Sequence, residues 1–259
     1  MPLLEAKGVT IRFGGLTAVS DFNLAVEQHE LVGLIGPNGA GKTTIFNMLT
    51  GVYKPSEGEI FVNGHPTADC KPFDITALGV ARTFQNIRLF KELTVLDNVK
   101  IGGHIHYTYS GTSAVLHTNR FHQAEDVAER EALALLRIFD LESRAGHYAK
   151  NLPYGDQRRL EIARALAARP KLLLLDEPAA GLNDRETLDL MQTIHDVRDK
   201  FDITILLIEH NMELVMGICE RIVVLNFGKT IAQGTPEQVR NNPVVIEAYL
   251  GEPAESMEA

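Results

Sequence analysis

The stretch LVGLIGPNGAGKTTIFNMLT, residues 31–50, decides the fold of this chain. Its first five residues are continuously apolar, as in a strand that is buried on both faces of a parallel sheet. Residues 36–43 then fit the phosphate-binding pattern G-x-x-x-x-G-K-[ST], and a helical stretch, residues 42–50, follows directly. A strand that passes through a glycine-rich turn into a helix is the context in which this pattern binds phosphates. The chain is therefore predicted to contain an α/β nucleotide-binding core.

The residues of this turn have separate predicted roles. Glycines let successive backbone N–H groups converge on the phosphates, and the helix N-terminus adds a favourable dipole. Lys42 should reach the β- and γ-phosphates of ATP, and the Thr43 hydroxyl should ligate Mg²⁺. The predicted nucleotide-binding residues of the turn are Gly36, Pro37, Asn38, Gly39, Ala40, Gly41, Lys42, Thr43 and Thr44.

A second motif, LLLLDEP (172–178), supplies two acidic residues at the end of an apolar run. Asp176 can hold Mg²⁺ through its water shell, and Glu177 then lies where it could orient and activate the attacking water. The same pattern also occurs where a buried strand merely ends in a capped turn. Together with the phosphate-binding turn, it favours a site of ATP hydrolysis.

The rest of the chain alternates strands with helices, which indicates a mainly parallel sheet. Strand pairs are expected at 58–64 and at 221–234, with a turn at Gly228.

Residues 93–151 have a residue pattern typical of helices. Thr94 and Asp97 have the spacing of a capping box, which marks the start of a helix. Further along, four apolar residues spaced by four, three and four share one helical face: Ala128, Ala132, Leu135 and Phe139. We interpret this region as a mostly helical lobe inserted into the core.

Composition sets the class of protein but not its activity. The chain has 259 residues, of which 45% are hydrophobic and 23% are charged, and its formal net charge is −9. An acidic balance disfavours a general nucleic-acid-binding scaffold. No apolar run approaches the roughly 18–20 residues that a membrane span requires. Cys70 and Cys219 form no spaced pattern, which favours a reducing, cytoplasmic environment.

The order of these motifs resembles ATP-binding-cassette (ABC) ATPases over nearly the whole chain. The resemblance implies a P-loop NTPase fold with a RecA-like core and an antiparallel N-terminal β-subdomain, residues 1–92 and 168–259, and an inserted helical subdomain, residues 93–167. It implies that Phe13 stacks on adenine, although a lone Phe is more often a core residue. It also implies that Gln85 ligates Mg²⁺ and senses the transporter, and that His210 acts near the γ-phosphate. The matching segments are 36–43, Gln85, 151–159, 176–177, 180–183 and His210.

The family's signature, LSGGQ, completes the ATP site of the opposite subunit in a head-to-tail dimer, but here it reads LPYGDQ (152–157). Pro153 has neither the serine hydroxyl nor an N–H, and Tyr154 replaces a glycine. Gly155 survives, and its N–H can still face an anion. Asn183 stands where Asp is usual. Since this chain's own ATP-binding residues are intact and only the contribution to the partner is weakened, the pattern favours a heterodimer with a related ATPase.

Among ABC ATPases, the sequence resembles LivG-type subunits of branched-chain amino-acid uptake systems. The motifs that carry this resemblance are YGDQRR, RTFQNIRLFKELTVLDNV, AAGLN, LLIEHNMELVMGI and PEQVRNNPVVIEAYLGE. The resemblance implies a LivF-type partner ATPase, two membrane permeases that dock near residues 85–95 and the inserted lobe, and a periplasmic binding protein. It also implies a peripheral position on the cytoplasmic face of the inner membrane.

Three alternatives stay open at this point. Urea or amide uptake and lipopolysaccharide export use related ABC subunits. A soluble ABC protein of DNA repair or translation usually has two cassettes or a long coiled-coil insertion, and neither is visible here. A small-molecule P-loop kinase lacks the series formed by Gln85, the signature and His210.

Overall fold

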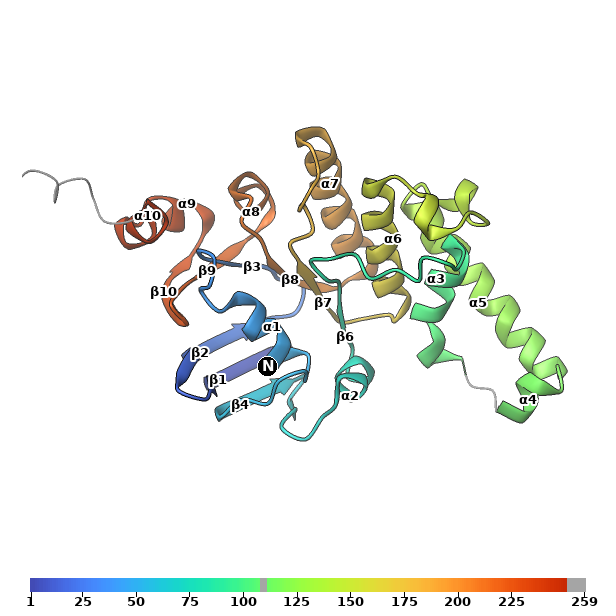
Figure 1. Cartoon of the computed structure of the whole chain (residues 1–259), viewed down its shortest axis with the longest axis horizontal. Helices are drawn as coiled ribbons and strands as arrows, with labels where there is room; N and C mark the ends of the chain where they lie inside the picture. Colours follow the sequence, from blue (N-terminus) through green and yellow to red (C-terminus); the bar gives the residue numbers. More distant parts are fainter. Residues whose placement is uncertain (108–110, 251–259) are drawn as a thin grey trace, which may run out of the picture.

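Two sheets contain the strands of the part of the chain that the computed structural model describes, residues 1–107 and 111–250 (Figure 1). The first sheet is antiparallel and has the order β2-β1-β4-β5. Its second strand is half-buried, because buried Phe22, Leu24 and Val26 alternate with exposed neighbours. Its strands are β1 (Leu4–Phe13), β2 (Leu16–Val26), β4 (Glu57–Val62) and β5 (His65–Pro66).

The second sheet has the order β10-β9-β3-β8-β7-β6, and only its edge strand β10 runs antiparallel to its neighbour. The predicted parallel sheet is therefore confirmed. Ile208 lies opposite both Leu34 and Asp176, so the turn after β3 and the acidic residues after β7 lie at one edge. Its strands are β3 (Leu31–Ile35), β6 (Val80–Arg82), β7 (Leu172–Asp176), β8 (Thr204–Ile208), β9 (Arg221–Asn226) and β10 (Lys229–Gly234).

Both faces of this parallel sheet are covered, which explains the continuous apolar runs of its central strands. Leu172 and Leu174 face a core shared with α1 (Lys42–Leu49) and the antiparallel sheet. Leu173 and Leu175 face a second core, shared with α7 (Asp184–Phe201), α8 (Met212–Ile218) and the helical lobe. The remaining helices of the core are α2 (Pro72–Ala77), α9 (Pro236–Arg240) and α10 (Pro243–Leu250).

The helical lobe, green to yellow in Figure 1, lies to one side of the sheet. Thr94 caps its first helix by accepting the Asp97 N–H at 3.0 Å, which confirms the predicted cap. The predicted apolar face is confirmed, since Ala128, Ala132 and Phe139 are buried. Leu135 is partly buried against the core that contains Ala132 and Phe139, and its neighbour Leu136 is fully buried. The lobe contains α3 (Val95–Gly102), α4 (Gly111–Val115), α5 (Asn119–Ile138), α6 (Tyr154–Ala167) and short 3₁₀ turns at His104–His106, Glu142–Arg144 and Ala149–Asn151.

The exact division of the chain at residues 93 and 167 stays a prediction. Residues 251–259, the end of the predicted core and of its last sequence motif, lie outside the described residues. Among the helices of residues 1–107 and 111–250, none combines the length and the apolar character needed to cross a membrane.

Candidate nucleotide site

A cleft of about 570 Å³ opens at the edge of the parallel sheet where β3 and β7 end. It brings together most of the predicted phosphate turn with Gln85 and Glu177. It also contains four residues that the sequence analysis missed, three at the start of β2 and one at the β9–β10 turn. The cleft is lined by Leu16, Thr17, Ala18, Asn38, Gly39, Ala40, Gly41, Lys42, Thr43, Thr44, Gln85, Glu177 and Phe227.

Two glycines give the phosphate turn its shape. Gly36 has φ 152°, and a Cβ atom at this position would lie 2.2 Å from the carbonyl oxygen of Leu225. Gly41 has φ 101° and caps the N-terminus of α1 in the left-handed conformation, which side chains rarely adopt. The backbone of the turn can therefore approach a phosphate closely, because no side chains intervene at these points.

Lys42 is buried inside this turn, with 7% of its surface exposed. Its ammonium donates hydrogen bonds to the carbonyl oxygens of Gly36 at 2.6 Å and Pro37 at 3.0 Å. Burial lowers the pKa of Lys42 below its usual value, and the carboxylates of Glu177 and Asp176 oppose that shift. A partly desolvated cation held beside the phosphate turn is well placed to exchange these carbonyl contacts for phosphate oxygens.

Asp176 is paired with an arginine that the sequence analysis did not single out. Arg82, at the end of β6, donates from Nη2 to Asp176 Oδ2 at 2.6 Å, and the two side chains are only 7% and 5% exposed. Arg82 also donates from Nη1 to Asn47 on α1 at 2.8 Å. The Asp176 carboxylate is therefore held by a buried cation from a neighbouring strand.

The side chains of Gln85, Glu177 and His210 lie close together. Gln85 donates from Nε2 to Glu177 Oε2 at 2.7 Å, and His210 Nδ1 lies 3.7 Å from the same oxygen. Glu177 has φ 47°, unusual for a residue with a side chain, and its N–H donates to the Ile208 carbonyl at 2.9 Å. This backbone conformation aims the carboxylate of Glu177 into the cleft.

The residues predicted to hold Mg²⁺ fit a hard cation. Thr43 offers a hydroxyl and Asp176 a carboxylate. Gln85 offers an amide oxygen, since the atom that contacts Glu177 is its amide nitrogen. An all-oxygen set of one carboxylate and neutral donors is the chemistry that Mg²⁺ prefers.

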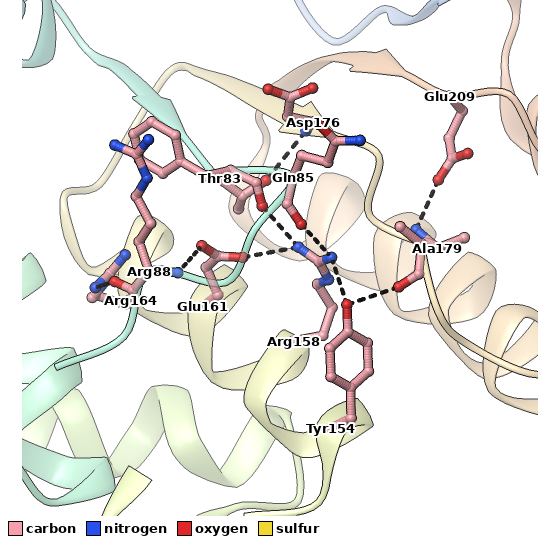
Figure 2. A network of polar contacts seen from close by, with 12 residues as sticks. Thr83, Gln85, Arg88, Tyr154, Arg158, Glu161, Arg164, Asp176, Ala179 and Glu209 are labelled. Atoms are coloured by element: carbon pink, nitrogen blue, oxygen red, sulfur yellow. Dashed lines mark hydrogen bonds and ion pairs between the residues drawn. The ribbon is translucent and has the colours of Figure 1, made fainter. Parts of the chain in front are cut away.

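Glu209, immediately before His210, is a further functional residue that the sequence analysis missed. Its side chain is completely buried. Oε1 accepts the Ala179 N–H at 2.7 Å, and Oε2 accepts the N–H groups of His210 at 3.0 Å and Asn211 at 3.1 Å. One carboxylate thus holds the segment after Glu177 and the segment that carries His210 in fixed relation (Figure 2).

Six predicted site residues are not part of the cleft lining, namely Phe13, Gly36, Pro37, Gly155, Asp176 and His210. Phe13 and Gly155 are the two of these whose surroundings have not yet been described. Phe13, at the end of β1, is 45% exposed and makes an edge-on contact with Tyr53, with ring centroids 5.3 Å apart. Its role in stacking on adenine stays a prediction. Gly155 lines a separate cavity of about 90 Å³, where a Cβ atom would lie 3.2 Å from Glu186 Oε1. The predicted contact between Gly155 and the phosphates of another subunit likewise stays a prediction.

Asn183 has a local structural role in its own chain. Its side chain accepts the Glu186 N–H at 3.0 Å, and the Glu186 carboxylate accepts the Asn183 N–H at 2.9 Å. This reciprocal pair caps α7. Asn and Asp are about equally good N-caps, so the departure from the family's usual Asp leaves the helix start intact.

The fold and the cleft together define a nucleotide-binding ATPase cassette. A family model described as ABC transporter matches residues 19–180, and a second, described as branched-chain amino acid ATP-binding cassette transporter, matches residues 229–255. The chain therefore belongs to the ABC transporter family.

Curated relatives span nearly the same length. The high-affinity branched-chain amino acid transport ATP-binding protein LivG of Escherichia coli K12 is 50% identical over 97% of this chain and 98% of its own. Its counterpart BraF of Pseudomonas aeruginosa is 49% identical over the same shares. The lipopolysaccharide export system ATP-binding protein LptB of Haemophilus influenzae is 35% identical, again over 97% and 98%.

Solved structures support the same fold. The ADP conformation of MJ1267, an ATP-binding cassette of an ABC transporter, has a TM-score of 0.83 and 29% identity, covering 97% of this chain and all of that one. A dimeric structure of MJ0796, a bacterial ABC transporter cassette, has a TM-score of 0.75 and 27% identity, covering 90% and 98%.

Proposed function

We propose that the chain is the ATP-binding and ATP-hydrolysing subunit that powers an ABC importer for branched-chain amino acids. The observation that carries the proposal is the 50% identity with LivG along nearly the whole of both chains. The sequence identity with LptB is 35%, 15 percentage points lower than with LivG, which favours uptake over lipopolysaccharide export.

The chain's own residues account for hydrolysis. Glu177 Oε2, already a hydrogen-bond acceptor at the cleft, takes the proton of the attacking water. Lys42 neutralises charge on the β- and γ-phosphates, and His210, 60% exposed and beside Glu177, stabilises charge at the γ-phosphate. Thr43, Gln85 and Asp176 would hold Mg²⁺, which would supply further charge neutralisation on the phosphates.

ATP binding closes two cassettes on each other, and this closure drives two membrane permeases from one access state to the other. The chain lies at the cytoplasmic face of the inner membrane, and a periplasmic binding protein delivers the amino acid. The exposed ring of Phe90 and the residues around it, between Gln85 and Val95, form part of the surface on which a permease docks.

The partner cassette is a paralogue of LivF type. Pro153, the N-cap residue of α6, makes no side-chain capping bond and has no N–H to donate across a dimer interface. The ATPase rate of this subunit alone and of its mixture with a paralogous partner tests the pairing. We expect stimulation in the mixture, whereas full activity as a homodimer would count against it.

Substrate class is tested by reconstitution. The chain is pulled down from membranes with its permeases, the complex is placed in vesicles, and ATP-dependent uptake of labelled leucine is compared with that of urea. The same complex with Glu177→Gln in this subunit is the matched control for ATP-dependent uptake. Uptake of urea but not leucine, or co-purification with lipopolysaccharide-export permeases, contradicts the proposal.

A further inference from the structure

Tyr154, which stands where the ABC signature has a glycine, contacts the segment after Glu177. Its hydroxyl donates to the Ala180 carbonyl at 3.0 Å. Its ring lies against Gly181, where a Cβ atom would be 3.2 Å from Tyr154 Cε1 and where φ is +79°. The tyrosine at the start of α6 and residues 179–183, which we call the D-loop, are therefore fitted to each other.

The same hydroxyl also accepts a hydrogen bond from Arg158, one helical turn further along α6. Arg158 Nη2 lies 3.3 Å from the Tyr154 oxygen and donates to the Gln85 carbonyl at 3.0 Å. Its Nη1 donates to the Phe84 carbonyl at 2.9 Å (Figure 2). Arg158 thus connects the signature helix to the segment that carries Gln85.

These contacts close into a ring through the proposed general base. Gln85 donates from its side chain to Glu177 at 2.7 Å, and the Ala180 N–H donates to the Glu177 carbonyl at 3.1 Å. The path Tyr154–Arg158–Gln85–Glu177–Ala180 returns to Tyr154 through the Ala180 carbonyl. A closed path restrains Glu177 from two sides, because both its carboxylate and its backbone belong to it.

Burial makes the Arg158 part of the ring rigid. The Arg158 side chain is 1% exposed, and Glu161 Oε2 lies 3.1 Å from its Nη1. The other oxygen of Glu161 accepts the Arg88 N–H at 3.1 Å, and burial raises the pKa of this carboxyl above its usual value. A buried guanidinium with this many fixed partners cannot move without breaking several hydrogen bonds at once.

We propose that Tyr154 is a positioning residue for hydrolysis, which ties the signature helix to Gln85 and the D-loop and thereby places Glu177. The inference rests on the proposed ATPase function. It gives the unusual signature residue a role inside its own chain, distinct from the contact that the signature makes to a partner's ATP. A movement of α6 would reach Glu177 by two routes of the closed path, one through Arg158 and Gln85 and the other through Ala180.

Hydrogen–deuterium exchange on the full chain tests the tie without any transport partner. Tyr154→Phe keeps the aromatic side chain and removes only the hydroxyl. We expect about three- to tenfold faster exchange in the D-loop and in residues 84–89, the equivalent of one or two ordinary hydrogen bonds, with the phosphate turn unchanged. Tyr148→Phe, the same change at a 51% exposed tyrosine nearby, is the control. Equal exchange in both variants would overturn the proposal.

Steady-state hydrolysis by the assembled complex then tests positioning. We expect Tyr154→Phe to lower kcat about three- to tenfold. KM for ATP should be unchanged, because Lys42 and the phosphate turn are not part of the closed path of contacts. An unchanged kcat, or a loss confined to KM, overturns the positioning role. The exchange experiment shows whether Tyr154 restrains the D-loop and residues 84–89, and its result does not depend on whether the complex transports amino acids. The two proposals can therefore fail separately.

Discussion

Replacing Arg82 by methionine should destabilise the nucleotide-free protein strongly. The substitution removes the partner of Asp176, whose side chain is 5% exposed and only 2.6 Å from Arg82. Breaking a buried ion pair from one side costs about 3–5 kcal/mol, because the remaining charge stays buried without compensation. At about 2–4 °C per kcal/mol for a domain of this size, the unfolding midpoint should fall by about 6–20 °C.

The assay is thermal unfolding with EDTA and with saturating Mg²⁺ and ATP. Because Asp176 is proposed to hold Mg²⁺, the cation would give it a new partner, and nucleotide and metal should recover at least half of the loss. Adding Asp176→Asn to Arg82→Met should also recover most of it, because no unpaired charge then stays buried. Arg137→Met removes an exposed pair with Glu142 and should leave the midpoint unchanged. A fall in the unfolding midpoint of Arg82→Met well below this range, or the same fall in EDTA and in Mg²⁺–ATP, would refute the reasoning.

Three further predictions concern the cleft. Glu177→Gln should lower phosphate release by about 10²–10⁴-fold, the range of general-base catalysis, while equilibrium binding of ATP persists; unchanged turnover would remove Glu177 as the base. Gly36→Ala places a methyl group where a Cβ meets the Leu225 carbonyl at 2.2 Å and should abolish binding of a fluorescent ATP analogue, whereas Gly15→Ala, with nothing within 4 Å, should not. Glu209→Gln should cost about 1–3 kcal/mol in urea unfolding, because buried backbone N–H groups lose a charged acceptor; no change would show that the amide satisfies them equally well.

Local patterns were sufficient to predict the central strands of the parallel sheet and the phosphate turn. The apolar runs 31–35, 172–175 and 204–208 are buried strands because each is covered on both faces. Thr235 and Pro236 begin α9 with a cap and a proline in the first turn, a pattern that depends only on adjacent residues. The predicted face is right to include Leu135, which packs partly buried against the core, but it omits the fully buried Leu136, because two neighbouring leucines on a helix fit one apolar stripe almost equally well.

Pairings between distant segments could not be read from the sequence. Arg82 and Asp176 are 94 residues apart, and they meet because β6 and β7 are parallel neighbours. Glu209 looks like an ordinary polar residue before a histidine, and its role depends on the Ala179 N–H from another segment. A charge-assisted acceptor of this kind is recognisable only once the backbone around it has been placed.

The signature of this chain shows why a motif can lose one contact and gain another. Pro153 has neither the hydroxyl nor the N–H that the family's signature serine offers, which is the basis for the proposed weakening of a partner's ATP site. Tyr154 is not a further loss of the same kind, because its hydroxyl has a donor and an acceptor within its own chain and its ring fits the space that Gly181 leaves. A glycine at position 154 would have neither contact, and Arg158 would then hold Gln85 without being held by the D-loop. Under the role proposed for Tyr154, the substitution directs the signature towards this chain's own Glu177, and the proposed pair with a paralogous cassette is the assembly in which such a change costs least.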